Sequence, residues 1–253
     1  MVAIDADNGI IKWKAAIGTE FMLCNPTVAD GRVVTASYYG GLYCYDALTG
    51  ALLWTFPMGI VRDNPSIVNG TLYLGSEGYV LVALDMATGL KKWAIPSYMD
   101  ANNNFVHGVG SSPTVHNGIL YTSGLKAYDT ATGTFKWEYS LVNTGVLRPV
   151  CENGTIFGLS AGDVVFAINS DGTLKWQYGT TGSVQPYIEI ANPTVAHGVI
   201  FTGCGMNNNL IALNAASGQL LWKYEGTMPF ISGPCVVDGK NNTFHSNSSG
   251  AQQ

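Results

Sequence analysis

Short apolar and polar runs alternate along the whole chain, and one pattern of them occurs six times. Each copy has a small residue, an apolar residue and Asp or Asn, then a polar turn ending in Gly, then a run ending at Trp. The copies are Ala3–Trp13, Cys44–Trp54, Ala83–Trp93, Ala127–Trp137, Ala167–Trp176 and Ala212–Trp222. An apolar run, an Asx–Gly turn and a second run are typical of two strands joined by a tight turn. Each copy is therefore predicted to be a β-hairpin.

A second hairpin pattern precedes most of these copies. It reads Pro, Ser or Thr, a β-branched residue, two further residues, Gly, and then a β-rich run. It begins at Pro26, Pro65, Pro113 and Pro193. The Asp-Gly and Asn-Gly pairs between apolar runs favour a hairpin. Two hairpins give four strands per repeat, which is one blade of a β-propeller.

The repeat spacing and the two chain ends predict a closed ring. Successive tryptophans are 41, 39, 44, 39 and 46 residues apart, and a period near forty is typical of a repeat fold. The chain begins with a second hairpin (Val2–Lys14) and finishes with a first one (Pro234–Gly239, then Thr243–Ser246). Joined together, these halves would leave no free edge strand. The alternative is a piece of a longer array.

The predicted fold is therefore all-β: one six-bladed β-propeller of four-stranded antiparallel blades over residues 1–253, closed by pairing of the N- and C-terminal half-blades. The blades are expected at about 234–250 with 2–14, 26–55, 65–94, 113–138, 149–177 and 193–223.

The repeated pattern A-[LIY]-[DN]-x-x-[TS]-G-x-x-x-W, with P-[ST]-V-x-x-G upstream, resembles the repeat of the PQQ-like (quinoprotein-type) β-propeller family and covers essentially the whole chain. In that family the Trp of the outer strand docks between neighbouring blades. The resemblance thus implies a tryptophan docking motif in which the tryptophans are structural and bind no ligand. These residues are Trp13, Trp54, Trp93, Trp137, Trp176 and Trp222.

The resemblance leaves the activity open, because the family contains both PQQ-dependent alcohol dehydrogenases and non-catalytic scaffolds. The dehydrogenases carry adjacent cysteines over the quinone, an additional Trp that stacks on PQQ, and a Ca²⁺ or lanthanide site. Here no two cysteines are adjacent, every Trp belongs to the repeat, and no motif carries the metal ligands. We therefore expect a non-catalytic binding or scaffold module for a protein or glycan partner. The alternatives are a dehydrogenase-like or other small-molecule enzyme, with PQQ and Ca²⁺ as its cofactors, and a purely structural module of a larger surface protein.

A site is expected at the mouth of the central channel, where propellers of this connectivity bind ligands. The loops that lead to each inner strand vary in length, as functional loops do. Polar residues before the inner-strand prolines are interpreted as a ring for an anionic or polyhydroxy ligand, with Arg62 and Arg148 as carboxylate clamps. Alternatively, Asn before Pro simply favours a turn. The candidate ligand-binding residues are Asn25, Arg62, Asp63, Asn64, Arg148, Gln185, Tyr187, Glu189 and Asn192.

Candidates for catalysis lie in the same loops. His107, with Asp100 and Glu77, is a candidate acid–base group, although a single loop His is more often a surface residue. Loop carboxylates are candidates for holding Ca²⁺ through oxygen atoms, but no contiguous calcium loop supports a metal site. These carboxylates are Asp63, Glu77, Asp163 and Glu189.

Composition narrows the function classes. With 12 Lys and Arg, 17 Asp and Glu and a net charge of −5, the chain lacks the basic face that nucleic acid requires. No run approaches eighteen uninterrupted apolar residues, so no membrane span is predicted. The first residues have no signal-peptide pattern, and a monomer in an extracellular or periplasmic location is expected. Five cysteines cannot all pair within one chain, and Cys44, Cys151 and Cys235 are expected in the core.

Overall fold

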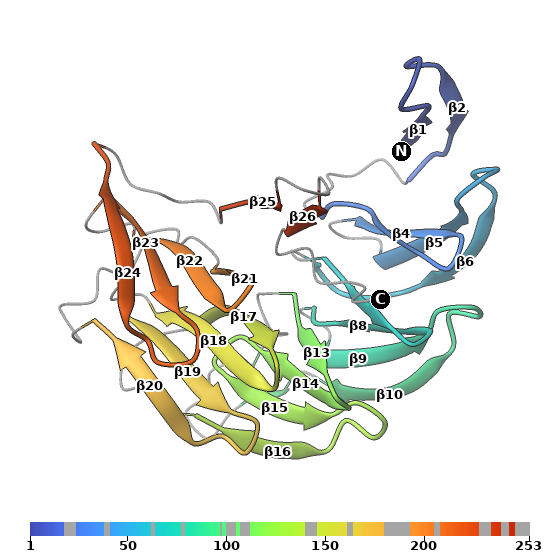
Figure 1. The fold of residues 1–253 in the computed structure, drawn as a ribbon. Coiled ribbons are helices and arrows are strands. Elements are labelled where there is room, and N and C mark those ends of the chain that lie inside the picture. Colours follow the sequence, from blue (N-terminus) through green and yellow to red (C-terminus); the bar gives the residue numbers. More distant parts are fainter. Residues whose placement is uncertain are drawn as a thin grey trace. The chain divides into compact units, whose positions relative to one another are not determined.

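The computed structural model contains only strands as regular secondary structure in the part of the chain that it describes (Figure 1). It describes residues 1–17, 24–37, 41–61, 64–76, 79–96, 98–99, 105–106, 112–139, 146–160, 164–179, 193–204, 208–227, 234–238 and 243–245. The chain divides into two compact units. Unit 1 is Met1–Pro113 with Thr130–Gly133 and Ser249–Gln253, and unit 2 is Thr114–Asp129 with Thr134–Ser248. The predicted all-β class is confirmed.

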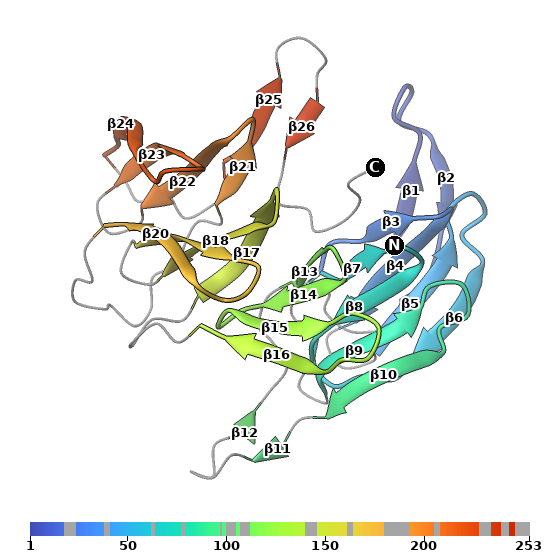
Figure 2. The ribbon, with the colours of Figure 1, turned by 60° about the horizontal axis from the view of Figure 1, so that its bottom comes forward.

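Unit 1 contains two four-stranded antiparallel sheets and two short two-stranded ones (Figure 2). The four-stranded sheets are β3 (Thr27–Ala29), β4 (Arg32–Ser37), β5 (Gly41–Asp46) and β6 (Leu52–Phe56), then β7 (Ser66–Val68), β8 (Thr71–Leu74), β9 (Tyr79–Asp85) and β10 (Lys91–Pro96). The two-stranded sheets are β1 (Val2–Ile4) with β2 (Ile11–Lys14), and β11 (Tyr98–Met99) with β12 (Phe105–Val106).

Unit 2 repeats the same sheet three times and adds one two-stranded sheet. The four-stranded sheets are β13 (Thr114–His116), β14 (Ile119–Thr122), β15 (Lys126–Asp129) and β16 (Phe135–Glu138); β17 (Val146–Glu152), β18 (Thr155–Ser160), β19 (Val165–Asn169) and β20 (Leu174–Tyr178); and β21 (Thr194–Ala196), β22 (Val199–Cys204), β23 (Asn209–Asn214) and β24 (Leu220–Glu225). The last sheet pairs β25 (Val236–Asp238) with β26 (Thr243–His245). Strand order follows chain order in every sheet.

Both kinds of predicted hairpin form. In the first kind, Asp30 and Gly31 have φ of 48° and 69°, and Asn69 and Gly70 have φ of 48° and 67°. Two consecutive positive φ angles define the tight turn whose twist suits a hairpin, and Asn, Asp and Gly tolerate them best. In the second kind, every Trp pairs with the small residue of its motif, as Ala83 does with Trp93. The small residue leaves room beside the indole.

The hydrophobic core lies between neighbouring sheets within each unit. In unit 1, Val34 and Cys44 of one sheet belong to the same buried cluster as Leu72 and Val82 of the next. In unit 2, one cluster joins β13–β16 to β17–β20 and a second joins β17–β20 to β21–β24. Because β21–β24 packs on its neighbour in the way that β17–β20 does, each repeat is stabilised mainly by the repeat beside it.

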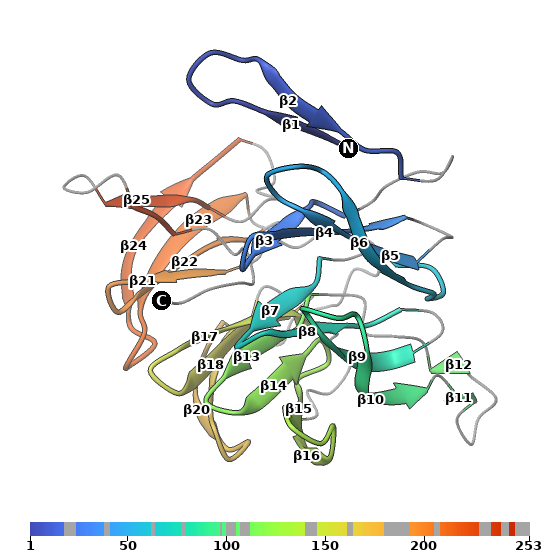
Figure 3. The same ribbon diagram turned by 90° about the vertical axis from the view of Figure 1, so that its right-hand side faces the viewer.

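The N- and C-terminal hairpins do not share a sheet in this structure. Figure 3 shows β1 and β2 as a two-stranded ribbon, and β25 pairs with β26 alone among the described strands. The composite blade expected from the two chain ends is therefore not formed here. The same two-stranded arrangement leaves Cys235 exposed, which corrects its expected place in the core, whereas Cys44 is fully buried and Cys151 is half-buried.

Candidate functional site

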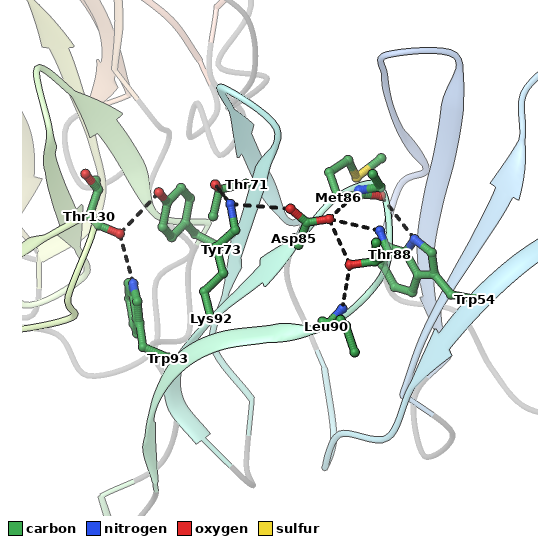
Figure 4. Close-up of polar contacts among 11 residues, drawn as sticks. Trp54, Thr71, Tyr73, Asp85, Met86, Thr88, Leu90, Lys92, Trp93 and Thr130 are labelled. Atoms are coloured by element: carbon green, nitrogen blue, oxygen red, sulfur yellow. Dashed lines mark hydrogen bonds and ion pairs between the residues drawn. The ribbon is translucent and has the colours of Figure 1, made fainter.

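The best-defined polar structure in the described part of the chain is an Asx turn that ends the third strand in the sheets β3–β6, β7–β10 and β21–β24, shown for Asp85 in Figure 4. The Oδ1 atom of Asp85 accepts hydrogen bonds from the backbone N–H groups of Ala87 (3.1 Å) and Thr88 (3.0 Å) and from the Thr88 hydroxyl (2.9 Å). The Gly89 N–H donates to the Asp85 carbonyl at 2.8 Å, with the Gly89 φ at 72°. The hydrogen bond from the Thr88 hydroxyl is the largest cause that lowers the pKa of Asp85. The carboxylate is held ionised as part of the turn.

Other repeats build the same turn with small changes. The pKa of Asp5 is lowered, first by its hydrogen bond with Lys12, and the pKa of Asp46 is lowered, first by the backbone N–H of Thr49. Asn214 replaces the carboxylate in the last complete sheet and still accepts from the N–H groups of Ala216 and Ser217, both at 3.0 Å. An amide oxygen can thus replace the carboxylate at this position. In the turn after β19 the acceptor is shifted to Oδ1 of Asp171, which accepts from the Thr173 N–H (2.9 Å) and hydroxyl (2.6 Å).

Five tryptophans donate a hydrogen bond to the Asx turn of the following repeat. In each case the acceptor is the carbonyl of the residue that follows Asp or Asn. The Nε1–O distances are 3.0 Å for Trp13 to Ala47, 3.1 Å for Trp54 to Met86, 2.9 Å for Trp93 to Thr130, 3.0 Å for Trp137 to Ser170 and 3.1 Å for Trp176 to Ala215. Figure 4 shows the Trp54 and Trp93 bonds.

The glycine of the turn lies against the same indole. A Cβ atom built on Gly50 would lie 2.6 Å from Cδ2 of Trp13, and one on Gly89 would lie 2.7 Å from Cδ2 of Trp54. Gly133, Gly172 and Gly218 face Trp93, Trp137 and Trp176 in the same way. The sequence pattern explains these glycines by their positive φ alone. The contact with the preceding repeat's indole is a second requirement, and its signal in the sequence is that Gly and Trp recur together.

Lysine on the outer strand adds a further link within a sheet. Nζ of Lys92 lies 2.7 Å from the Thr71 hydroxyl and 3.6 Å from Oδ2 of Asp85 (Figure 4). Both charged side chains are more than a third exposed or close to it, so solvent screens this pair and it adds little stability.

Hydroxyl groups link the inner strands of consecutive repeats. The hydroxyls of Ser66 and Thr114 donate to the carbonyls of Pro113 and Pro149, and that of Thr194 donates to the Pro234 carbonyl at 2.6 Å. Each donor is the Ser or Thr of a Pro-Ser/Thr motif, and each acceptor is the Pro or its counterpart in the next repeat. The motif thus carries an inter-repeat contact that its hairpin interpretation did not include.

Of the predicted ligand-binding residues, the structure brings two together. In unit 1 the backbone N–H of Asn25 donates to Oδ1 of Asn64 at 2.7 Å, just before the inner strands β3 and β7. Arg148 lies within β17, which fixes its backbone position only. The other candidates lie outside the described residues: Arg62, Asp63, Glu77, Asp100, His107, Asp163, Gln185, Tyr187, Glu189 and Asn192.

Strand directions define two ends of each sheet. In β3–β6 the start of β3, the end of β4, the start of β5 and the end of β6 lie at one end, which we call the loop end. Asn25 lies at the loop end and is exposed, whereas the Asp46–Gly50 turn lies at the opposite end, with Leu48 86% exposed. Asn25 and Asn64 therefore mark the loop end as the described part of the predicted site.

Two buried hydroxyls were not singled out by the sequence pattern. Oγ1 of Thr35 and Oγ of Ser160 have no hydrogen-bond partner within the described ranges, although both residues are almost completely buried. A polar residue at an inward position of a middle strand is the signal that would have identified them.

Most tryptophans and several turn carboxylates of the described residues are engaged in the repeat framework. Five of the six indoles are engaged with Asx turns, and Asp5, Asp46 and Asp85 are engaged in those turns themselves. No three His, Cys, Asp or Glu side chains gather at metal-binding distance within these ranges. Nor does this part of the chain contain a helix long and apolar enough to cross a membrane.

Comparisons with known proteins agree with the repeat. The chain is 29% identical over 228 residues to the outer membrane protein assembly factor BamB of Moranella endobia, covering 79% of this chain and 56% of that protein. It is 23% identical over 235 residues to the quinohemoprotein alcohol dehydrogenase ADH-IIG of Pseudomonas putida, covering 80% of this chain and 32% of the enzyme. The chain thus spans about half the length, or less, of the curated relatives that it matches.

Solved structures show the same fold. The crystal structure of BamB from Moraxella catarrhalis superposes with a TM-score of 0.71 at 20% identity, covering 94% of this chain and 73% of that one. The family model described as outer membrane protein assembly factor BamB matches residues 1–127 and 97–252, which together cover almost the entire sequence. With this match and the repeated hairpins of both units, the chain belongs to the PQQ-like repeat family represented by BamB.

Proposed function

We propose that this chain is a non-catalytic binding propeller that presents the loop end of its sheets to a protein partner. The observation that carries the proposal is the match of the BamB family model along residues 1–127 and 97–252. BamB relatives are named as outer membrane protein assembly factors, a role that depends on contacts with other proteins. A glycan partner remains a second prediction from the sequence.

The chemistry of the described residues supports a scaffold. A general acid or base is most effective when its pKa lies near the working pH. Here the described carboxylates with shifted pKa values are shifted downward, as for Asp46, Asp85 and Asp171 in the hairpin turns. Hydroxyls such as that of Thr194 connect one repeat to the next. These polar groups maintain the framework on which the loops are displayed.

The proposed location is the periplasm, with the chain acting as a monomer. The support is the name of the BamB relatives, which places their role at the outer membrane.

We also propose that the repeats are blades of a six-bladed β-propeller, at about 26–55, 65–94, 113–138, 149–177 and 193–223, with residues 2–14 and 234–250 supplying further blade strands. The support is the exposure of the first hairpin. Ile4 is 59% exposed, whereas Leu84, Ile168 and Leu213 at the matching position are fully buried. A hairpin with the apolar pattern of a blade favours completion by two inner strands. In such a propeller the five Trp–turn contacts would act as a tryptophan docking motif.

The quinoprotein alternative rests on a different observation, the similarity to quinohemoprotein alcohol dehydrogenases of Pseudomonas putida and Comamonas testosteroni. It would place PQQ and Ca²⁺ at the loop end, with residues such as Arg62 and Arg148 as ligands. Within the described part of the chain, five of the six tryptophans and the carboxylates of Asp5, Asp46 and Asp85 are engaged in turns, which supports the scaffold over this alternative.

Site-specific photo-crosslinking tests the proposal. A benzoylphenylalanine replaces Asn25 at the loop end or Leu48 at the opposite end, and the probe is a detergent-solubilised outer-membrane protein fraction from a Gram-negative bacterium. Replacing Asn25 leaves its contact with Asn64 possible, because that bond uses the backbone N–H of Asn25. We expect one discrete crosslinked protein from position 25 and little or none from position 48.

Equal crosslinking from both positions, or crosslinking from position 48 alone, would show that the loop end is not the binding face. A parallel sample contains PQQ, with and without Ca²⁺. Saturable protection of position 25 by PQQ would favour the quinoprotein alternative over the scaffold.

A further inference from the structure

Two of the first-hairpin turns share the same tripeptide but are held differently. Both read Asn-Gly-Thr, at Asn69–Thr71 and at Asn153–Thr155, and both connect two paired strands through two residues. Asn69 and Asn153 have φ of 48° and 49°, and both residues are exposed. The hydroxyl of the Thr accepts from a lysine Nζ in both repeats, at 2.7 Å in the first and 3.1 Å in the second. The two turns therefore form a matched pair.

One of the two turns is anchored by the second hairpin of its own repeat. The Met86 N–H donates to the Gly70 carbonyl at 2.9 Å. In the other repeat Ser170 occupies the position of Met86, and its N–H donates no hydrogen bond to the Gly154 carbonyl within the described residues. The Asx turn of that repeat is one residue shorter than the other five, so the equivalent N–H is not presented to the glycine. The turn that contains Asn153 therefore lacks this anchor.

An exposed Asn followed by Gly can cyclise and lose ammonia. The backbone nitrogen of the Gly, after hydroxide has removed its proton, attacks Cγ of the Asn side chain, and the Cγ–Nδ2 bond breaks to release ammonia, which takes up a proton from water. Glycine favours the attack because it has no side chain that obstructs it. Water then opens the five-membered succinimide ring. Breaking the new N–Cγ bond leaves aspartate, whereas breaking the original peptide N–C bond leaves isoaspartate, in which the chain continues through the side chain.

The closed turn opposes this reaction. Ring closure requires the Gly nitrogen and Cβ of the Asn to be nearly eclipsed about the Cα–C bond of the Asn. In a two-residue turn with consecutive positive φ angles, ψ of the first residue is about 30°, which holds these two atoms far from the eclipsed arrangement. The turn must therefore open locally before the Asn can cyclise, and the rate of cyclisation follows the population of the open turn.

We propose that Asn153 is a deamidation site of the folded protein and that it converts faster than Asn69. The turn at Asn69 must break one more backbone hydrogen bond in order to open, because Gly70 is anchored and Gly154 is not. One such bond changes the population of the open turn by roughly 2- to 10-fold. The Gly154 N–H, which carries the attacking nitrogen, faces the sulfur of Cys151, a weak acceptor that restrains it little.

Peptide mapping of the full chain tests the proposal. The folded protein is incubated at pH 8 and 37 °C, and digests taken over time are analysed by mass spectrometry for aspartate and isoaspartate at positions 69 and 153. We expect position 153 to convert roughly 2- to 10-fold faster than position 69. A parallel sample unfolded in urea is the control, because the two identical Asn-Gly-Thr segments should then convert at equal rates.

Three results of this experiment would overturn the proposal. Position 69 converts as fast as position 153, or faster, in the folded chain. The difference persists in urea, which would assign it to local sequence and not to the anchor. Position 153 stays unconverted in the folded chain while the unfolded chain converts fully, which would show that the turn is protected without the anchor.

Hydrogen–deuterium exchange measures the opening of the turns directly. Thr71 and Thr155 close the two turns by pairing with Val68 and Glu152. We expect the Thr155 amide to exchange faster than the Thr71 amide, in the same ratio as the deamidation rates. Slower exchange at Thr155 would contradict the proposal. In the variant Asn153→Gln conversion at this position should nearly cease, because glutamine would have to form a six-membered ring, and this variant confirms the position of the mass change.

Discussion

At the scale of single residues, the turn glycine shows why this repeat tolerates so little variation. Gly89 must adopt a φ of 72° and must also leave space for the ring of Trp54. Any side chain here meets both obstacles, because L-residues disfavour this conformation and the nearest ring atom would lie 2.7 Å from Cβ. Gly70, with a φ of 67° and open surroundings, meets only the first. Two glycines that look alike in the sequence therefore differ in what a substitution would do.

The turn carboxylate predicts a dependence of stability on pH. The folded pKa of Asp85 lies below its ordinary value of 3.8, so its contribution is present above that value and is lost as the pH falls through the folded pKa. Asp85→Asn keeps an acceptor oxygen, as Asn214 does naturally, but cannot titrate. We expect Asp85→Asn to be close to wild type near pH 7 and to lose less stability than wild type between pH 5 and pH 3.

Urea denaturation at a series of pH values measures this difference. Asp7→Asn is the matched control, because the Asp7 carboxylate accepts no hydrogen bond in the described turn. An Asp85→Asn profile parallel to wild type over the whole range would contradict the prediction.

At the scale of elements, side-chain hydroxyl groups connect the inner strands of consecutive repeats. These hydrogen bonds are additional to the backbone pairing within each sheet. Thr194 begins β21, is almost completely buried, and donates to the Pro234 carbonyl just before β25. The short strand β25 pairs with β26 in a two-stranded sheet, and this bond links the residue before it to the preceding sheet. The equivalent bond from Thr114 joins β13–β16 to β17–β20, which share a buried apolar cluster as well.

Removal of this hydroxyl should loosen β25 selectively. Thr194→Val keeps the side-chain shape and is expected to lower the free energy of unfolding by about 1 kcal/mol. Hydrogen–deuterium exchange in the segment Val236–Asp238 should become faster, while exchange in β22 and β23 should change little.

Thr202→Val is the control, since the Thr202 hydroxyl is buried in the same sheet but donates only to the neighbouring Gly203 carbonyl at 3.4 Å. Faster exchange of β25 in both variants would mean that the Thr194 bond is not what holds the strand.

The elements themselves were predictable because their signals are local. Asp30-Gly31 and Asn69-Gly70 specify their turns within two residues, and each Trp lies opposite a small residue within one hairpin. The contact between Trp54 and the next repeat was implied only by family resemblance, because nothing within one hairpin shows which carbonyl the indole reaches. For the loop end, the sequence predicted where the candidate residues lie but not how their side chains are arranged. Asn25 and Asn64 lie together there, but the geometry of a loop depends on long-range packing that no local pattern encodes.

At the scale of the whole molecule, the protein has a low proportion of charged residues. Lys, Arg, Asp and Glu make up 11% of the residues, and large apolar side chains such as Leu48 and Leu90 are 86% and 69% exposed. Solubility then depends on a small net charge, which is −5 at pH 7. Contacts between repeats stabilise the fold. Electrostatic repulsion between molecules, which opposes aggregation, is comparatively weak.

We therefore expect a pronounced solubility minimum near pH 5.2, the isoelectric point of the sequence. Light scattering across pH 4 to 8 measures it. Leu48→Asp with Leu90→Asp adds two carboxylates at exposed turn positions and should raise solubility at pH 7 and move the minimum to lower pH. A minimum that does not move would show that aggregation is driven by an apolar surface elsewhere.

The five tryptophan bonds also bear on how the protein is made. They join residues 34, 32, 37, 33 and 39 positions apart, so the partner of each indole is always in the next repeat to be synthesised. During synthesis, each Trp can form its hydrogen bond as soon as the hairpin of the next repeat has left the ribosome. The bond does not require segments that are synthesised later. The repeats would therefore fold one after another, from the first to the last, as they are translated.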